Sequence, residues 1–369
     1  MVHYLKQQKN TIYLNKLNMF GKLNKPFLIA EVSSNHDGSF ANAKKLIKAA
    51  KDYGADAVKL QTYTPNSMTV NSKKKYFQIK SGLWKNYNLW DLYKKAQTPY
   101  RWHKKLFLYA KSINIKIFST PFDENAVDFL EKLNCPFYKI ASFEMTDLPL
   151  IKKVASTKKP IIISTGMASL DEISLSFNTA KKNGAKNIAL LYCVSNYPSK
   201  ISDFNLNNIK VLKKKFKCEI GFSDHSNDFR IASMAVKLGA TIVEKHISLG
   251  NVKALDSDFS ISGEKIIEYK KAINNFSRIQ KNHLFTKKLL GKKKFFRNTS
   301  EEKSKMFRRS IFVVRKITTG DTLNKFNIRK IRPGYGISAS YYEKILGKKS
   351  TVNIEANEPL TKKLLSKMI

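Results

Sequence analysis

The sequence has few cysteines and no long apolar run, and both shortages narrow the class of protein. Its 369 residues include three cysteines, which are Cys135, Cys193 and Cys218. Because they are widely spaced and odd in number, we interpret them as reduced core residues, without a disulfide framework or a zinc site. No apolar stretch is long enough to span a bilayer, and Met1–Phe20 lacks the apolar core of a signal peptide. We therefore expect a cytoplasmic protein without a membrane partner.

Acidic residues are also scarce. The chain has 28 Asp and Glu against 68 Lys and Arg, a formal net charge of +40. Such a charge can indicate a nucleic acid or membrane partner. The lysines, however, are spread in pairs and triples along the predicted helices, and no arginine-rich cluster interleaved with aromatics is present. We therefore expect solvated helix faces, no nucleic acid partner, and a positive field that favours small anionic substrates.

A glycine-rich phosphate turn is missing after the first predicted strand, which disfavours a doubly wound open sheet. The sequence has instead eight apolar strand candidates, most of them separated by helical patterns. The predicted strands are Phe27–Val32, Ala57–Leu60, Ile115–Ser119, Phe137–Ala141, Pro160–Ser164, Ile188–Cys193, Glu219–Ser223 and Thr241–Lys245. Eight β/α units over roughly 250 residues predict a closed (β/α)8 TIM barrel of the α/β class, with the open sheet as the alternative.

Composition divides the chain into four parts. Residues 1–24 form a polar, lysine-rich N-terminal extension, and residues 25–285 carry the predicted barrel. Residues 286–307 read as a charged linker, and residues 308–369 show short strands between closely spaced turn residues. So small a β-rich domain must pack on a partner surface. The aromatic-rich connection from Gln61 to Ile115 predicts a packed subelement within the barrel domain.

The stretch from Glu219 to His246 predicts a strand, a helix and a second strand. The helix falls within Asn227–Leu238, with Ser226 or Asn227 as its N-cap. A right-handed crossover brings the two strands side by side, so His225 and His246 are expected at the carboxyl edge, where α/β barrels place their chemistry.

Two neutral imidazoles at that edge can form a divalent metal site with open positions. The alternative is a pair of packed or surface histidines. Glu31, Glu144 and Asp256 could complete the metal site or act as acid and base.

Three lysines interrupt apolar strands, where burial without a partner is costly. These lysines, with four hydroxyls that follow predicted strands, indicate an anion pocket for a phosphate or a phosphate and carboxylate. The set is Lys59, Lys139, Lys245, Thr120, Ser142, Ser164 and Ser223. Strand lysines are also compatible with a Schiff-base aldolase, which the residues alone leave open.

With these motifs, the chain resembles the sialic acid (nonulosonic acid) synthase family beyond its N-terminal extension. The motifs that carry the resemblance are E-V-S-S-N-H, K-L-Q-T-Y, F-S-T-P-F-D, Y-K-I-A-S-F-E, I-I-S-T-G-M, S-D-H, V-E-K-H and R-R-S…I-R-P-G-Y-G. The last of them resembles the SAF (antifreeze-like) domain. Fragments such as Q-T-Y-T-P-N-S-M-T and G-L-W-K-N-Y-N-L-W-D-L-Y are similar to the branch that makes pseudaminic acid.

The resemblance implies a transferase that condenses phosphoenolpyruvate with the open-chain aldehyde of an N-acetylated amino sugar. For the pseudaminic branch the sugar is 2,4-diacetamido-2,4,6-trideoxy-altrose, and phosphate leaves with C–O cleavage. The implied alternatives within the family are synthases of N-acetylneuraminate and legionaminate. The S-N-D that follows His225 departs from the T-x-G of many relatives, which puts the sugar in question more than the chemistry.

The resemblance also implies roles for individual residues. Phosphoenolpyruvate would be held by Lys59, Thr120, Lys139, Ser142, Ser164 and Ser223. His225 and His246 would bind Mn²⁺, with Mg²⁺ or Co²⁺ as alternatives. Glu31, Gln61, Tyr197 and Asp256 would orient the sugar, with Glu31 also counted among the catalytic residues. Glu144 would handle the proton of the attacking water. Arg332 would reach the sugar's acyl group from the SAF domain of the other subunit in a domain-swapped homodimer. A non-enzymatic polyanion-binding scaffold is the remaining alternative, and only the net charge favours it.

Overall fold

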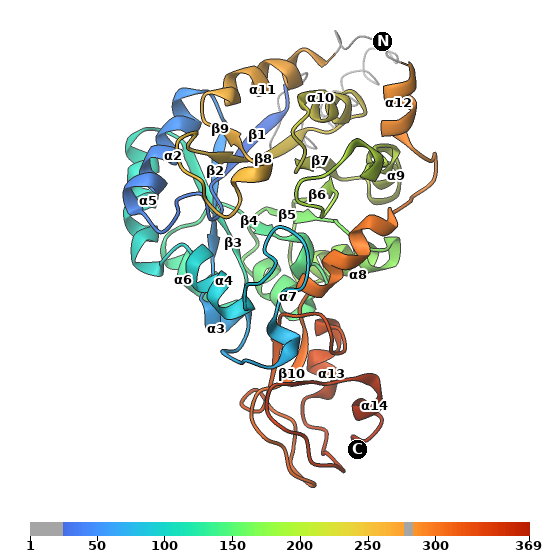
Figure 1. The fold of residues 1–369 in the computed structure, drawn as a ribbon. Helices are drawn as coiled ribbons and strands as arrows, with labels where there is room; N and C mark the ends of the chain where they lie inside the picture. The colour runs from blue at the N-terminus through green and yellow to red at the C-terminus, as the bar shows by residue number, and fades with distance from the viewer. Residues whose placement is uncertain (1–24, 277–282) are drawn as a thin grey trace, which may run out of the picture.

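The computed structural model describes residues 25–276 and 283–369, which form a barrel and a smaller domain attached to one end of it (Figure 1). Strands that follow one another in the chain pair in parallel, and β1 also pairs with β8, so the barrel is closed. The strands are β1 (Phe27–Glu31), β2 (Ala57–Thr62), β3 (Lys116–Pro121), β4 (Tyr138–Ile140), β5 (Ile161–Ser164), β6 (Ile188–Cys193), β7 (Glu219–Asp224) and β8 (Ile242–Ser248), followed by the short β9 (Ile261–Ser262). The predicted TIM barrel is confirmed.

Helices cover the outside of the barrel. They are α2 (Phe40–Asp52), α5 (Tyr100–Ser112), α6 (Glu124–Lys132), α7 (Leu148–Ser156), α8 (Leu170–Lys182), α9 (Asn207–Phe216), α10 (Phe229–Lys237) and α11 (Lys265–Asn274). Helix α2 illustrates how the sequence sets their bounds. The Ser39 side chain caps its first turn, and its apolar stripe is buried against the barrel. Gly54, with φ of 91°, follows its end.

The direction of each strand side chain follows the alternation of the pleat. On β8, Glu244 and His246 point into the barrel, whereas Lys245 between them points toward the outer layer. The Lys245 Nζ donates to the carbonyls of Asp224 and Phe259 at 3.3 and 3.2 Å. The prediction that Lys245 joins the anion pocket is therefore wrong, because its neighbours occupy the inward positions.

The long connection between β2 and β3 is packed, as predicted. It contains α3 (Pro65–Met68) and α4 (Leu89–Ala96), and its apolar side chains form a separate cluster beside the barrel. Tyr63, Phe77 and Tyr93 belong to this cluster, together with Phe312 and Ile331 of the C-terminal domain. The two domains therefore share apolar packing.

The C-terminal domain contains a three-stranded antiparallel sheet in the order β11-β10-β12. These strands are β10 (Ser310–Val313), β11 (Ile328–Ile331) and β12 (Glu358–Pro359), and the short helices are α13 (Tyr342–Ile345) and α14 (Lys362–Leu365). The backbone N–H of Arg332 donates to the carbonyl of Met68 at 2.8 Å. The domain therefore lies against the segment that follows β2, at the carboxyl end of the barrel.

The segment predicted as a charged linker is folded onto the barrel. It includes α12 (His283–Leu290) and the 3₁₀ helix η6 (Thr299–Phe307). The Glu301 side chain is buried and accepts hydrogen bonds from the backbone N–H groups of Met167 and Ser195, both at 2.8 Å. Arg297 donates to the carbonyls of Cys193 and Ala168 at 2.9 and 3.1 Å. This segment thus clamps the loops that follow β5 and β6. The predicted N-terminal extension, residues 1–24, lies outside the described residues.

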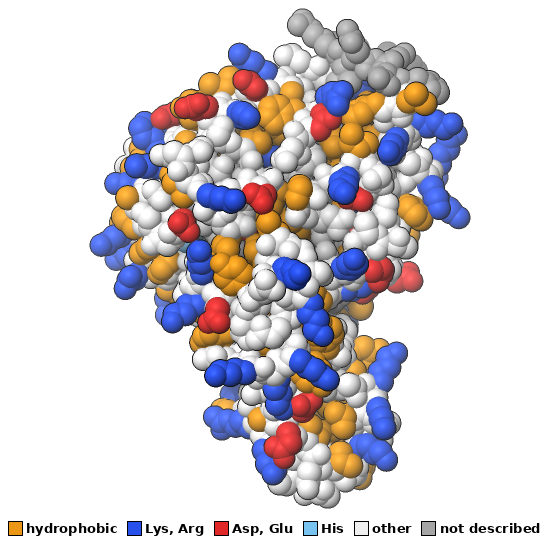
Figure 2. Space-filling view, in the orientation of Figure 1, with side chains coloured by type: hydrophobic (Ala, Val, Ile, Leu, Met, Phe, Trp, Pro, Cys, Tyr) orange, Lys and Arg blue, Asp and Glu red, His pale blue; other side chains and the backbone are white. Residues whose placement is uncertain are grey.

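The surface carries its positive charge in a dispersed form. Figure 2 shows Lys and Arg side chains scattered over both domains on the face in view. Within the described parts of the chain, no helix has the length and apolarity to cross a membrane. The three cysteines are free. Cys135 and Cys193 are buried as core residues, whereas Cys218 is half-buried.

Candidate active site

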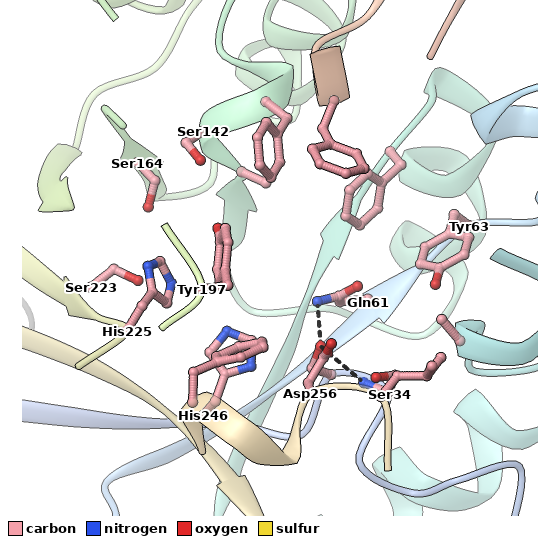
Figure 3. Close-up of a pocket in the computed structure, with 18 of the residues that line it drawn as sticks. Ser34, Gln61, Tyr63, Ser142, Ser164, Tyr197, Ser223, His225, His246 and Asp256 are labelled. Carbon is pink, nitrogen blue, oxygen red and sulfur yellow. Dashed lines mark hydrogen bonds between the residues drawn. The ribbon is translucent and has the colours of Figure 1, made fainter. Parts of the chain in front are cut away.

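The carboxyl end of the barrel holds a pocket of about 140 Å³ (Figure 3). Most of the residues singled out from the sequence line it, although they come from six strands or their following loops and from the C-terminal domain. They are Lys59, Gln61, Lys139, Ser142, Ser164, Tyr197, Ser223, His225, His246, Asp256 and Arg332. The predicted residues Glu31, Thr120 and Glu144 are buried but do not line the pocket.

One wall of the pocket is a compact charged cluster. Lys59 Nζ lies 2.9 Å from Glu244 Oε2 and 2.8 Å from Glu31 Oε2. Lys139 Nζ lies 3.0 Å from both Glu244 oxygens. The Ser223 hydroxyl donates to Glu244 at 2.9 Å. Two ammonium groups and a hydroxyl converge on one carboxylate.

The charge state of this cluster follows from burial and from its internal pairing. Burial opposes ionisation of Glu244, but the ammonium groups of Lys139 and Lys59 outweigh it and lower the pKa of this carboxyl. Burial lowers the pKa of Lys59 to about 7, against the opposing charge of Glu244. The two lysines share the single carboxylate of Glu244. A ligand with several negative charges would give each lysine an anionic partner of its own.

Two buried hydroxyls that were predicted for the anion pocket have no hydrogen-bond partner in the described part of the chain. Thr120 Oγ1 and Ser164 Oγ are buried and make no hydrogen bond within the described residues. Ser142 Oγ lies 3.2 Å from Ser195 Oγ. Because a buried hydroxyl without a partner is unfavourable, these groups are suited to oxygen atoms of a ligand.

The two imidazoles lie together beside the charged cluster, two residues beyond Ser223 and Glu244 on the same chain segments, with ring centroids 5.6 Å apart. Burial lowers the pKa of His225 to about 4 and that of His246 well below its usual range, so both rings are neutral at pH 7. His225 Nδ1 contacts the carbonyl of Val194 at 2.8 Å, which assigns its proton to Nδ1 and leaves Nε2 free to accept. The buried Nδ1 of His246 has no hydrogen-bond partner in the described structure.

This donor set fits a divalent metal held by two imidazole nitrogens, with water and substrate at the other positions. No group of three His, Cys, Asp or Glu side chains suited to a metal occurs in residues 25–276 and 283–369. The expectation that Glu31, Glu144 or Asp256 completes the metal site is therefore not met. Each carboxylate is instead committed to a neighbour within the protein.

Another part of the pocket wall combines a carboxylate with aromatic side chains. Asp256 accepts hydrogen bonds from the Ser33 hydroxyl and, at 3.4 Å, from the Ser34 backbone. Burial raises the pKa of Asp256, and these hydrogen bonds oppose the shift. The Tyr197 ring lies 4.5 Å from the His225 ring and 5.8 Å from Trp84, measured between centroids. Carboxylate and aromatic surface on one side of a pocket are typical of carbohydrate sites.

Arg332 enters the pocket from the C-terminal domain of the same chain. Its guanidinium donates to Glu144 Oε1 at 2.7 and 3.2 Å and to the Tyr93 hydroxyl at 3.2 Å. Arg309 Nε lies 3.4 Å from the same carboxylate oxygen. Glu144 thus lies behind Arg332, which lines the pocket from the C-terminal domain.

Sequence reasoning missed the charged residues Glu244, which lines the pocket, and Arg309 and Glu301, which lie behind its wall. Glu244 is the most important omission. It lies two residues before His246 on a strand, so its side chain could have been predicted to point to the same face as His246. Arg309 and Glu301 contact residues that are far away in the sequence, and no local sequence pattern indicates these contacts. The N-cap prediction for α10 was also wrong, since Asp228 rather than Ser226 or Asn227 caps this helix.

The fold and the site together define the class, and the comparisons agree. The NeuB family model matches residues 46–284, and the SAF domain model matches residues 308–366. The chain belongs to the NeuB family and carries a C-terminal SAF domain.

Individual relatives cover nearly the whole chain. It is 41% identical to pseudaminic acid synthase from Helicobacter pylori, over 92% of this chain and 97% of the relative. It is 39% identical to pseudaminic acid synthase from Campylobacter jejuni, over 94% and 98%. N,N'-diacetyllegionaminic acid synthase from Campylobacter jejuni is 38% identical over 91% and 99%. Among solved structures, the spore coat polysaccharide biosynthesis protein SpsE from Bacillus subtilis has a TM-score of 0.79 and 30% identity, over 95% and 97%.

Proposed function

We propose that this protein is a pseudaminic acid synthase. It condenses phosphoenolpyruvate with the open-chain aldehyde of 2,4-diacetamido-2,4,6-trideoxy-altrose and releases phosphate. The observation that carries the proposal is the convergence of an anion cluster, an imidazole pair and a carbohydrate-like wall on one pocket, in a chain of this family. Three free cysteines agree with the reducing cytoplasm as its compartment.

In this proposal, Lys59 and Lys139 bind the phosphate and carboxylate of phosphoenolpyruvate. The hydroxyls of Thr120, Ser142, Ser164 and Ser223 donate to the same oxygens. Lysines are suited to this task because the leaving phosphate gains charge as its C–O bond breaks. Glu244 balances the two lysines in the free enzyme and holds them apart at the positions that the ligand requires.

The sugar lies between Asp256, Gln61 and Tyr197, with its aldehyde directed at the imidazole pair. C3 of phosphoenolpyruvate attacks the aldehyde carbon and a C–C bond forms. Water then adds at C2, and phosphate leaves with its bridging oxygen. His225 and His246 would hold a divalent metal, Mn²⁺ in our proposal, which would supply Lewis-acid polarisation of the aldehyde and activation of water. Glu31, which pairs with Lys59, keeps that lysine oriented toward the ligand.

Glu144 was expected to handle the proton of the attacking water. Its position behind Arg332 supports a different role. We propose that it fixes the guanidinium of Arg332, which then donates to an acyl oxygen of the sugar. The buried guanidinium would hold a planar acceptor with two parallel donors, which favours an acetamido group over a hydroxyl.

The decisive experiment measures phosphate release from phosphoenolpyruvate with a panel of amino sugars. We expect turnover with the altrose derivative, weak or no turnover with the precursors of legionaminic and N-acetylneuraminic acid, and loss of activity in EDTA. His246→Ala should abolish turnover. His103→Gln serves as the control because His103 is buried outside the pocket, against Thr62. Full activity in EDTA or in His246→Ala would refute the proposal.

The aldolase alternative keeps one supporting observation, which is the lowered pKa of Lys59. A Schiff-base enzyme needs such an uncharged amine. Borohydride treatment with pyruvate should then add mass to Lys59. An unmodified chain after this treatment excludes the aldolase.

We also propose a homodimer in which the SAF domains are exchanged. Exchange of an identical element reproduces every contact of Arg332 in the partner's pocket, so the same geometry serves both arrangements. Coexpression of an Arg332→Ala chain with a His246→Ala chain distinguishes the exchanged dimer from an assembly without exchange. In an exchanged dimer, the intact barrel of one chain receives the intact Arg332 of the other, and activity returns. In an unexchanged assembly every site carries one lesion and stays inactive.

A further inference from the structure

Of the three lysines predicted for the anion pocket, Lys245 is the one that the proposed reaction does not use, and its surroundings are unusual. Its side chain is about 1% exposed, and it lies between the barrel and the outer helices. An outward strand position normally carries an apolar side chain that packs on a helix. A buried ammonium is costly at such a position unless several groups satisfy it.

Three backbone carbonyls satisfy this ammonium. Lys245 Nζ donates to the carbonyls of Asp224 and Ser226, and to that of Phe259 at 3.2 Å. The first two belong to the residues on either side of His225. The third belongs to the turn that follows Asp256. An ammonium has three donors, and here each one is directed at a carbonyl of the two loops that edge the pocket.

The counter-charge comes from Asp224, whose Oδ2 lies 3.9 Å from Lys245 Nζ. The same carboxylate accepts from the Tyr269 hydroxyl at 2.8 Å and from the Ser226 backbone and hydroxyl at 2.9 and 2.6 Å. The loop that carries His225 is therefore fixed before and after the histidine, on the side away from the pocket.

The second loop reaches the other imidazole. The Phe259 ring lies 4.8 Å from the His246 ring between centroids. The backbone carbonyl of Asp256 accepts from the Ser260 hydroxyl at 2.6 Å. A shift of the Phe259 carbonyl would consequently move both an aromatic neighbour of His246 and the turn that presents Asp256.

We propose that Lys245 is a positioning residue that ties the loop of His225 to the turn of Asp256 and Phe259, and so couples metal binding to sugar recognition. The inference rests on the proposed function, because it concerns the metal pair and the sugar side of that site. The phosphoenolpyruvate side is not part of this coupling, since Lys59 and Lys139 lie on the inner face of the barrel and contact Glu244 instead.

The test compares the full-length Lys245→Met variant with the wild type. Mn²⁺ affinity is measured by electron paramagnetic resonance of the unbound ion, and the KM values of both substrates are measured separately. We expect Mn²⁺ affinity to fall about 10-fold or more, as for other residues that orient metal ligands. The KM of the sugar should rise as well, while the KM of phosphoenolpyruvate stays within about twofold.

Lys270→Met is the matched control. Lys270 is also an ion-paired lysine, 3.0 Å from Asp56, but it lies at the end of the barrel away from the pocket. This variant should lose stability without a change in Mn²⁺ affinity. Unchanged Mn²⁺ affinity in a folded Lys245→Met variant overturns the inference.

Two further outcomes are informative. If Lys245→Met does not fold, the Tyr269→Phe variant provides the test. It is the milder change, because it removes only one hydrogen-bond donor to Asp224. A several-fold loss of Mn²⁺ affinity in Tyr269→Phe supports the coupling, and wild-type affinity overturns it. Failure of the wild type itself to bind Mn²⁺ contradicts the proposed metal site. That result is distinct from a failure of Lys245 alone.

Discussion

Arg332 of the SAF domain donates two hydrogen bonds to Glu144 of the barrel, at 2.7 and 3.2 Å, from a position that lines the pocket. The pair is buried on both sides, with side-chain exposures of 7% and 0%. The small domain therefore supplies part of the pocket wall, and its position on the barrel helps to set the shape of the pocket.

Arg332→Lys should weaken sugar binding. Lysine keeps the charge but loses the planar fork, and a hydrogen bond to a charged group contributes about 1.5–3 kcal/mol. We expect the KM of the sugar to rise at least tenfold and that of phosphoenolpyruvate to stay unchanged. Arg329→Lys is the control, because Arg329 contacts Asn66 outside the pocket. Equal effects of the two substitutions would remove the special role of Arg332.

Glu244→Gln should destabilise the free enzyme and make it responsive to anions. The substitution leaves Lys59 and Lys139 buried without their shared counter-charge, and breaking a buried pair costs about 3–5 kcal/mol. Inorganic phosphate should restore part of this loss, because it binds only the folded chain. Thermal melting with and without phosphate measures both effects. A variant that melts like the wild type, or that phosphate does not stabilise, would contradict the cluster described for this wall.

Asp256→Asn should change how stability depends on pH. Burial raises the pKa of Asp256, so the folded chain holds this proton more tightly than the unfolded chain. The wild type consequently loses stability as pH rises from the usual aspartate pKa, about 3.9, toward the raised value. The asparagine side chain does not ionise, so the variant does not lose this stability as pH rises.

Urea unfolding near pH 4 and near pH 8 should therefore show an advantage of Asp256→Asn that grows with pH, although sugar turnover falls. Asp258→Asn, at an exposed carboxylate two residues on, is the control. An advantage that shrinks as pH rises would have the wrong sign for a raised pKa.

Glu301→Gln tests the clamp formed by the linker. Its carboxylate accepts from two backbone N–H groups, one in the loop after β5 and one after β6. Loss of the charge should cost about 2 kcal/mol of stability and raise the KM of phosphoenolpyruvate, since Ser164 precedes the first of these loops. Glu302→Gln is the matched control, because Glu302 is 60% exposed and pairs only with Lys305. Comparable losses in the two variants would mean that the clamp has no role in the pocket.

Most of the barrel was predictable because parallel strands buried on both faces leave continuous apolar runs. All eight strands were found, and β6 was found with its exact bounds. The positions of the inward groups were harder to predict, since a run of three polar residues such as Glu244, Lys245 and His246 does not reveal the phase of the pleat. The phase depends on which residue the neighbouring strands pair with, here Glu31 against His246.

The remaining omissions have a different origin. Arg309 reaches Glu144 across more than 150 residues of sequence, and the packing of Phe312 and Ile331 against Phe77 brings it there. Periodicity describes neighbours in sequence, and it carries no signal for such contacts.

The shared packing of the two domains also has a consequence for biosynthesis. A chain emerging from the ribosome acquires all eight barrel strands while Arg309 and Arg332 are still untranslated or within the exit tunnel. At that stage Glu144 is a carboxylate without its guanidinium partners, and the aromatic cluster around Phe77 is open to solvent. We therefore expect the nascent barrel to expose this aromatic surface until the last part of the chain has been translated and the C-terminal domain covers it.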